Sequence, residues 1–350
     1  MRSTYTIVLT LLLIAPAIAQ TICPSTSATD VITISGSTTV QPISDAWGAA
    51  YSAQCGAIVN VYGGGSSSGA QRVCGVTTTG TAVDIGAMSR AWRTSEATAG
   101  SPGYKYQCVI GPKPKVVQID VAIESLVVIL KKSSLPDVCI AALGGLTFAQ
   151  LRWVFSSYTV AQLTATGWPA SALVNSDGND NTHLYSEISP ACPATEIKLV
   201  GPSLALSSYS YFFETIFTGI GETFATTTRP PGAGYSGTTT DNATINAVIN
   251  DLTGATIGYV SYNAFNSVST TVSAVSLRKA ADYVAPTTTR IASGTYPLCR
   301  RIYMNVRFTT VAKTKAFIQY GMSAMGTANV IAQGFTPLPA SARATMVARL

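Results

Sequence analysis

Three short segments combine hydroxyl side chains with glycine directly after a run of apolar, β-branched residues. They are Gly36–Thr39, Gly63–Gly69 and Gly86–Arg90. We expect each to lead from the end of a strand into the first turn of a helix. A helix N-terminus offers unpaired N–H groups and the positive end of the helix dipole. Together with the hydroxyls, these groups suit the binding of a small oxyanion.

The repetition of this design matters as much as the residue types. A single loop of this kind is most often ordinary capping and turn chemistry, because Ser and Thr cap helices and Gly permits turns. Loops that follow several strands of one open sheet, however, meet at the carboxyl edge of those strands. Three in succession therefore favour one site at which hydroxyl and N–H donors converge on an anion.

Residues suited to catalysis are scarce around these loops. A Ser-His-Asp triad would depend on His183, the only histidine, which lies in a polar segment and is expected to be solvated. Gly63–Gly69 lacks the Lys of a nucleotide-binding P-loop, and Asp84 falls inside a predicted strand, where a structural role is more common. No Cys-x-x-Cys occurs, so no zinc site is expected. We expect no enzymatic activity, no cofactor and no metal.

The charge of the chain is low and dispersed. Of its 350 residues, 47% are hydrophobic and 11% are charged, and the formal net charge is +6. Basic residues never occur in runs longer than two, so the chain has no basic stripe of the kind that binds nucleic acid. The mild positive field favours small anions as ligands.

The N-terminus has the pattern of a secretory signal peptide. Arg2 provides the positive end, Ile7–Ile14 the apolar stretch and Ala17-Ile18-Ala19 the cleavage site. We predict that residues 1–19 are removed and that the mature chain is secreted, to the extracellular space, the cell surface or the periplasm. A bilayer span needs about 20 apolar residues. The apolar stretch and every later segment are shorter, so we expect no membrane span in the mature chain.

Strands and helices are predicted to alternate. The apolar patterns predict strands at 31–35, 58–62, 83–87, 115–130, 196–200 and 256–260, and helices at 38–53, 147–155, 207–217 and 241–252. Thr147 and Gln150 form a capping box at the start of one helix. The alternation predicts an α/β fold with a mostly parallel sheet. Extended stretches near 115–124 and 256–262 indicate two crossings between lobes.

The chain resembles the periplasmic phosphate-binding proteins, the substrate-binding receptors of ABC phosphate transporters. Between about residues 31 and 337, the resemblance rests on ITISGSTTVQPI, GGGSSSGAQRVCG, VDIGAMSRAW, VAIESLVVIL, LTFAQLRWVF, DNATINAVINDLTGATIGYVSY and SGTYPLCRRIYMNV, in the family's order. It implies a type II periplasmic-binding-protein fold over residues 24–340, with two Rossmann-like lobes and a two-crossover hinge. The crossings place lobe one at 20–121 and 262–350, and lobe two at 122–261.

The resemblance also implies which residues hold the anion. In lobe one they are Ser37, Thr38, Thr39, Ser67, Ser68, Gly69, Ser89 and Arg90. In the fourth loop the family has Gly-Pro and then a stretch ending in Asp-Ser-Gly-Thr, whereas this chain has Ala205 and Leu206 at the Asp and Ser positions. Ser207 and Ser208 remain as hydroxyl donors there. This loop is therefore expected to weaken phosphate binding.

The expected function is the capture of phosphate or a similar small oxyanion between the two lobes. An ABC transporter permease is the expected partner if the host is bacterial. The alternative is a surface or matrix protein that keeps the fold and has lost tight anion binding. The altered fourth loop is the feature that separates these two hypotheses.

The seven cysteines and one sequon complete the expectations. Cys23 precedes the first strand and Cys55 ends the following helix, so both lie at the same edge of the sheet and can pair. Two further pairs are predicted, one on positions that recur in some relatives and one within lobe two, leaving a free thiol: Cys74–Cys108, Cys139–Cys192 and Cys299. Asn242-Ala243-Thr244 is an N-glycosylation sequon if the host glycosylates secreted proteins.

Overall fold

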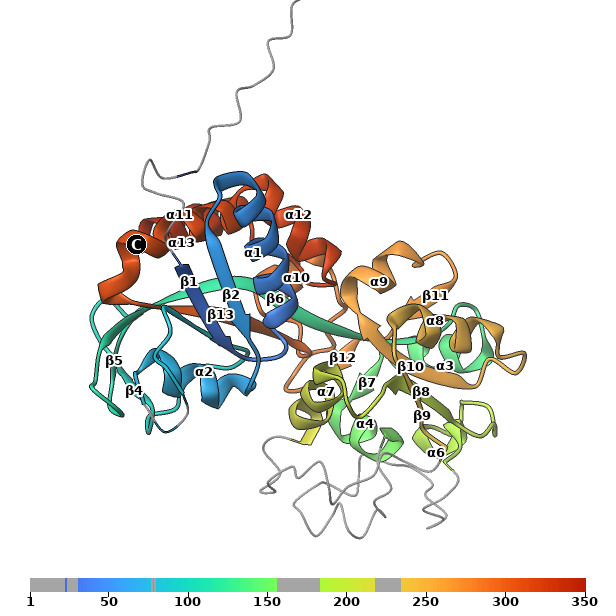
Figure 1. Cartoon of the computed structure of the whole chain (residues 1–350). Helices are drawn as coiled ribbons and strands as arrows, with labels where there is room; N and C mark the ends of the chain where they lie inside the picture. The colour runs from blue at the N-terminus through green and yellow to red at the C-terminus, as the bar shows by residue number, and fades with distance from the viewer. Residues whose placement is uncertain (1–22, 24–30, 77, 79, 156–182, 218–233) are drawn as a thin grey trace, which may run out of the picture.

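One long strand, β6 (Lys115–Lys131), runs through both halves of the molecule in the computed structural model (Figure 1). The structure describes residue 23 and residues 31–76, 78, 80–155, 183–217 and 234–350. Within these residues the main sheet has the strand order β2-β1-β3-β13-β6-β10-β8-β9, with β4, β5 and β11 attached beside this path. The predicted signal peptide, residues 1–19, lies outside the described residues.

The N-terminal half begins with the predicted βα units. β1 (Val31–Gly36) leads into α1 (Gln41–Cys55) and β2 (Ile58–Tyr62) into α2 (Gly65–Val73). β3 (Ile85–Met88) leads into a loop and then a further strand, so the helix predicted after Gly86–Arg90 does not form. The strands β2, β1 and β3 are parallel neighbours, so the loops that leave them begin at one edge of the sheet. A β-hairpin of β4 (Ala97–Ala99) and β5 (Lys105–Cys108) then pairs with the start of β6.

The other half is built on the second part of β6. β8 (Lys198–Pro202), β9 (Ser236–Thr238) and β10 (Thr256–Ser261) are parallel to one another, and β10 pairs with β6. Its helices are α3 (Leu135–Ala142), α4 (Phe148–Phe155), α6 (Tyr185–Ile188), α7 (Ser207–Phe217), α8 (Asp241–Asn250) and α9 (Tyr262–Ser267). The predicted capping box of α4 is confirmed, because Thr147 Oγ1 accepts from Gln150 N and Gln150 Oε1 accepts from Thr147 N.

The C-terminal part returns the chain to the first half. Strand β13 (Cys299–Arg307) lies between β3 and β6 and is antiparallel to both. The helices α11 (Val311–Met322), α12 (Ala324–Ala332) and α13 (Ala340–Ala348) follow η3 (Phe308–Thr310). They cover the same side of the sheet as α1 (Figure 1). Trp47 of α1 is buried there, with its ring 6.2 Å from that of Phe317.

The sheet is mixed, and this corrects the prediction of a mostly parallel sheet. The outer strands of each half are parallel, as predicted, but β13, β6 and β10 form antiparallel pairs in the centre. The reason is that β6 leads the chain out of the first half and β13 brings it back. The sequence patterns of both strands show apolar residues but not the direction of their pairing.

The pairing of two short strands can be compared with the lobe boundaries predicted from the sequence. The short strands β11 (Val272–Ala274) and β12 (Leu277–Arg278) fall inside the segment 262–350, which was assigned to lobe one. They pair with the far end of β6 and with β7 (Leu146–Thr147), respectively. Helix α10 (Thr288–Ala292) follows them and precedes β13. The lobe boundaries drawn from the sequence stay a prediction.

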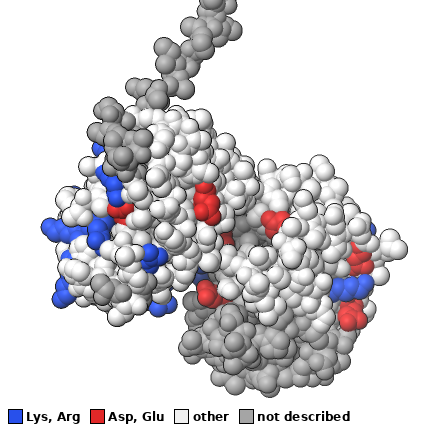
Figure 2. Space-filling view, viewed as in Figure 1, with Lys and Arg blue, Asp and Glu red and all other residues white. Residues whose placement is uncertain are grey.

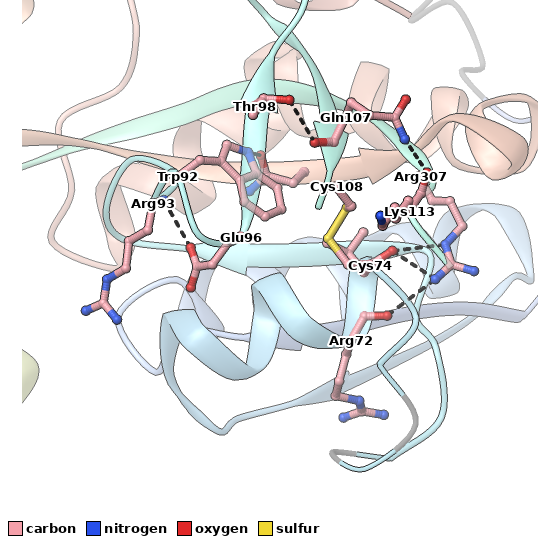
Figure 3. Close-up of a disulfide and its surroundings, with 12 residues drawn as sticks. Arg72, Cys74, Trp92, Arg93, Glu96, Thr98, Gln107, Cys108, Lys113 and Arg307 are labelled. Atoms are coloured by element: carbon pink, nitrogen blue, oxygen red, sulfur yellow. Dashed lines mark hydrogen bonds between the residues drawn. A yellow bond between two sulfur atoms is a disulfide. The ribbon is translucent and has the colours of Figure 1, made fainter. Parts of the chain in front are cut away.

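The structure contains the three predicted disulfides. Cys23–Cys55, Cys74–Cys108 and Cys139–Cys192 have Cα–Cα distances of 5.3, 5.8 and 5.3 Å, and Cys299 is free. Figure 3 shows the second bridge, which ties the C-terminus of α2 to β5. Beside it the guanidinium of Arg307 donates to the Val73 carbonyl at 2.8 Å. A cation at this position satisfies carbonyl groups that a helix leaves unpaired.

Two sequence predictions concern side chains outside the site. His183, expected to be solvated, is buried, with 8% of its surface exposed and its ring 4.0 Å from that of Trp153. The expectation was wrong because the residues next to His183 in the sequence are polar and do not indicate that its ring packs on an aromatic residue of α4. Asn242 is exposed at the start of α8, whereas Thr244 of the same sequon is buried.

Candidate functional site

A cavity of about 240 Å³ lies between the loops of the two halves. From the N-terminal half it is lined by Ser37, Thr38, Thr39, Gly65, Ser66 and Ser89. From the second half it is lined by Ala205, Leu206, Ser207, Ser210, Tyr211 and Glu214 of the α7 region. Arg300 of β13 completes the lining. Hydroxyl groups from the loops that follow β1, β2 and β3 and from a fourth loop thus face one volume. This arrangement is a concave polar site of the kind that holds a small ligand.

The first loop, between β1 and α1, is held by the backbone and side chain of Ser37. Its N–H donates to the carbonyl of Ala87 on β3 at 2.9 Å, and its Oγ accepts from Thr39 N at 3.2 Å. Ser37 and Thr39 are buried, whereas Thr38 is exposed. The N-cap residue of α1, Val40, has no capping side chain, so the first turn of that helix keeps N–H groups unsatisfied by a side chain. Ser37, Thr38 and Thr39 all line the cavity, and Thr38 is the one whose side chain is exposed.

The second and third loops are joined to each other. Ser66, in the first turn of α2, has its Oγ 3.2 Å from the Oγ of Ser89, and it also accepts a 3.0 Å hydrogen bond from Ser89 N. The N-cap residue Gly64 has φ +130°, which favours glycine, and no side chain caps this helix. Ser66 was not among the residues expected from the sequence, although it belongs to the predicted loop. The signal was present, because Ser66 is the first hydroxyl of the Ser66–Ser68 run.

The other expected residues of α2 lie outside the cavity lining. Ser67 Oγ accepts from Arg90 at 3.1 Å. The side chain of Ser68 lies over Gly64, near the position a Cβ would take there. Gly69 packs against β1 and β3: a Cβ on it would lie 3.0 Å from Gly36 Cα and would collide with the Ala87 carbonyl oxygen. Gly69 therefore permits close packing of α2 on the sheet.

Arg90 does not line the cavity either. Its two Nη atoms donate to the carboxylate of Glu96 at 2.9 and 2.7 Å. Burial of Glu96 opposes its ionisation, but the hydrogen bonds from Arg90 and from Arg93 N outweigh this, so the pKa of Glu96 lies below its usual value. The charge of Arg90 is thus neutralised by a close partner. Ser89, its neighbour, is the residue of that loop that lines the cavity.

The α7 region supplies the opposite wall. Ser207 begins α7, and Ser207, Ser210, Tyr211 and Glu214 lie three or four residues apart along one face of that helix. Ser208, expected from the sequence to be a donor, is not in the lining. Ala205 and Leu206 do line the cavity, so the substituted positions of the fourth loop face the ligand volume directly. The side chains of Ala205 and Leu206 cannot donate a hydrogen bond into the cavity.

Arg300 is a charged residue of the cavity that the sequence analysis did not select. It stands opposite Glu124 in the register of β13 with β6, and its Nε donates to Glu124 Oε2 at 2.7 Å. Its guanidinium carbon lies 4.0 Å from the centre of the Tyr211 ring. Burial raises the pKa of Glu124, and the charge of nearby Glu214 adds to this, while Arg300 opposes it. The pairing of β13 with β6 brings Arg300 next to Glu124, and the sequence alone does not indicate this pairing.

Figure 2 shows that Lys and Arg gather mainly over the half of the molecule that contains β1 to β5. Among the described residues, no group of three His, Cys, Asp or Glu side chains is placed to hold a metal ion. In the same part of the chain, no helix is both long enough and apolar enough to cross a membrane.

The sequence matches the PBP superfamily domain over residues 24–324. The chain belongs to this superfamily. A comparison with curated protein sequences gives no match. The family assignment thus rests on a match across most of the chain, and the predicted relation to the periplasmic binding proteins is confirmed.

Solved structures show the same fold as this PBP superfamily protein. A possible phosphate binding protein from Planctomyces limnophilus has a TM-score of 0.67 and 20% identity, covering 92% of this chain and 98% of that one. PstS from Borrelia burgdorferi has a TM-score of 0.56 and 17% identity, covering 89% and 99%. An ABC-type phosphate transport receptor from Vibrio cholerae has a TM-score of 0.55 and 19% identity, covering 88% and 100%. The α/β fold predicted from the sequence is confirmed.

Proposed function

We propose that this protein captures phosphate, or a small oxyanion of similar shape, in the cavity between the two halves. The observation that carries the proposal is the convergence of Thr38, Ser66, Ser89 and Ser207 on one cavity of about 240 Å³. These residues come from four separate segments: Thr38 precedes the N-cap of α1, and Ser66 and Ser207 lie in the first turns of α2 and α7. Helix N-termini and hydroxyls are the donors that oxyanions accept from.

The names of the similar structures support the same ligand. One is called a possible phosphate binding protein, and another an ABC-type phosphate transport receptor. In this proposal the protein acts by binding and not by catalysis, with a transporter permease as its partner in a bacterial host. The three disulfides favour an oxidising compartment, and secretion of the chain after removal of residues 1–19 accords with that.

We further propose that the two halves act as lobes that close over the ligand. The sequence predicts lobe one at 20–121 and 262–350 and lobe two at 122–261, and in this proposal the return crossing moves from Tyr262 to a position after Arg278. The cavity is lined from both sides, so a ligand that contacts both walls favours the closed arrangement. β6 is one of the connections between the lobes. The pairing of β11 and β12 with strands of the second half supports a return crossing that follows Arg278.

Isothermal titration calorimetry of the mature chain, residues 20–350, tests the proposed ligand. Phosphate, sulfate and chloride are titrated separately into protein freed of bound anion by dialysis. Saturable binding of phosphate with one site per chain supports the proposal. Absence of binding by every oxyanion contradicts it and supports instead a surface or matrix protein that has kept the fold.

A further inference from the structure

The strongest unassigned feature of the cavity is a fixed arginine. Arg300 lies on β13, about ninety residues after the α7 wall, and its side chain is 21% exposed. Its Nε is used by Glu124, whose side chain is 8% exposed, in a 2.7 Å ion pair. The two Nη atoms make no hydrogen bond to the described residues, and Arg300 lines the cavity. The Nε of the Arg300 guanidinium is therefore bound to Glu124, and its two Nη atoms are available to donate hydrogen bonds to a ligand.

A second contact fixes the plane of the guanidinium. The ring of Tyr211 covers it at 4.0 Å, and the Tyr211 side chain is buried, with 4% of the residue exposed. The Tyr211 hydroxyl is also buried and has no hydrogen-bond partner among the described residues. Stacking on an aromatic ring and an ion pair at Nε together leave the Arg300 side chain little rotational freedom. A preorganised donor loses less conformational entropy when it binds its ligand.

We propose that Arg300 is the charged recognition residue of this cavity and that it replaces donors missing from the 201–208 loop. The inference rests on the proposed function and deepens it. A guanidinium offers parallel N–H groups, which match two oxygens on one centre. The ligand class is therefore an oxyanion such as phosphate, with two oxygens on one atom, and not a halide. Glu124 and Tyr211 act as positioning residues, since each acts through Arg300.

This inference changes the affinity expected from the sequence. Loss of the two fourth-loop donors alone would weaken phosphate binding by about two to four decades. A charge-assisted fork from Arg300 offsets part of that loss, because hydrogen bonds to charged groups are about twice as strong as neutral ones. Leu206 still removes a donor from the opposite wall. The affinity of the site thus depends mainly on one arginine.

The next residue along the chain provides a matched control. Arg301 is not in the cavity lining and pairs with Asp120 at 2.8 Å, and Asp120 also lies 3.5 Å from Arg349. Arg301→Gln removes the same charge one position away and leaves Asp120 with a partner. Arg300→Gln alone would leave Glu124 as an unpaired buried carboxylate, which can unfold a protein. The test variant is therefore the double substitution Arg300→Gln with Glu124→Gln, and its fold is checked by circular dichroism.

Calorimetric titration with inorganic phosphate compares the wild type, the double variant, Arg300→Lys and Arg301→Gln. We expect the double variant to bind phosphate at least about 30-fold more weakly than wild type, and Arg301→Gln to bind it within about threefold of wild type. Arg300→Lys is expected to have an intermediate affinity, because Lys keeps the positive charge but cannot donate two parallel hydrogen bonds. If wild type binds phosphate and the double variant matches Arg301→Gln, the inference is wrong and the proposed function stands. If the wild type binds neither phosphate nor sulfate, the proposed function fails and the inference falls with it; if it binds sulfate alone, the same variants are compared with sulfate.

Discussion

Ser66 and Ser89, 23 positions apart in the sequence, both line the cavity, and their hydroxyl oxygens lie 3.2 Å apart. Ser66 also accepts from the backbone N–H of Ser89 at 3.0 Å. The pair ties the first turn of α2 to the loop after β3. Two of the proposed anion-binding loops are therefore positioned by each other as well as by the sheet.

Ser66→Ala is expected to weaken phosphate binding by about 3- to 10-fold. The substitution removes one hydroxyl from the cavity and the hydrogen bond that fixes Ser89, and a single hydrogen bond contributes about 0.5–1.5 kcal/mol. Calorimetric titration with phosphate measures the change. Ser68→Ala is the control, because Ser68 belongs to the same helix and does not line the cavity. An equal loss of affinity in both variants would show that Ser66 has no special contact with the ligand.

Leu206→Ser is expected to tighten phosphate binding by about 2- to 10-fold. Leu206 faces the cavity, and Ser would restore a donor and reduce the bulk at that wall. Leu204→Ser is the matched control, because Leu204 lies in the same loop, is 57% exposed and is not part of the lining. Calorimetry of both variants decides the point. Unchanged or weaker binding by Leu206→Ser would mean that the fourth loop does not limit affinity.

Sequence patterns predicted several strands and helices whose fold depends mainly on residues close in the sequence. The alternation of apolar residues placed β1, β2, α7 and α8 within a few residues of their observed bounds. The helices after β13 were not anticipated. Their small, mildly apolar residues give a weak helical pattern, and their place in the fold depends on packing against α1.

The site was predictable in part for the same reason. Thr38 and Ser89 follow strands directly, so their place at the sheet edge could be inferred. Arg90, predicted to bind the anion, pairs with Glu96, six residues later, and is not in the cavity lining. Arg300 could not be selected at all, since its position in the cavity wall depends on the antiparallel register that pairs it with Glu124, 176 residues away. Tyr211 was within reach, because it follows Ser207 by four residues on a predicted helix.

Gly69→Ala is expected to destabilise the fold by roughly 1–3 kcal/mol. Its Cβ would collide with the Ala87 carbonyl oxygen and press on Gly36, which is backbone and cannot rotate away. Urea denaturation of the variant measures the free energy of unfolding. Gly103→Ala provides the comparison, because no atom would lie within 4 Å of a Cβ there. Equal stability of the two variants would contradict the packing role given to Gly69.

The thiol of Cys299 is expected to react slowly with iodoacetamide at neutral pH. Burial raises the pKa of Cys299 to about 11, although Arg301 opposes the shift, so the reactive thiolate is rare below that pH. The alkylation rate should rise with pH until the thiol ionises near its pKa, provided the protein stays folded. Peptide mass spectrometry without reduction follows the modified site. Rapid labelling of native protein at pH 7, or a bridge involving Cys299, would contradict this expectation.

Saturating phosphate is expected to reduce the radius of gyration, because a ligand held by both walls favours closure of the proposed lobes. Small-angle X-ray scattering with and without phosphate measures this. Sulfate or chloride at the same ionic strength controls for salt effects. An unchanged radius at full occupancy would argue that the cavity is preformed and that no hinge motion accompanies binding.

Because both halves of the molecule share strand β6, the position of this strand restricts how chimeras with homologous proteins can be built. Residues 115–131 pair with β5 and β13 on one side of the crossing and with β10 and β11 on the other. A recombination breakpoint inside this strand would remove a central strand from both halves of the main sheet. Neither half can therefore be exchanged for a homologous one by a single cut there, and a chimera that keeps β6 intact needs two joints, one on each side of the transplanted segment.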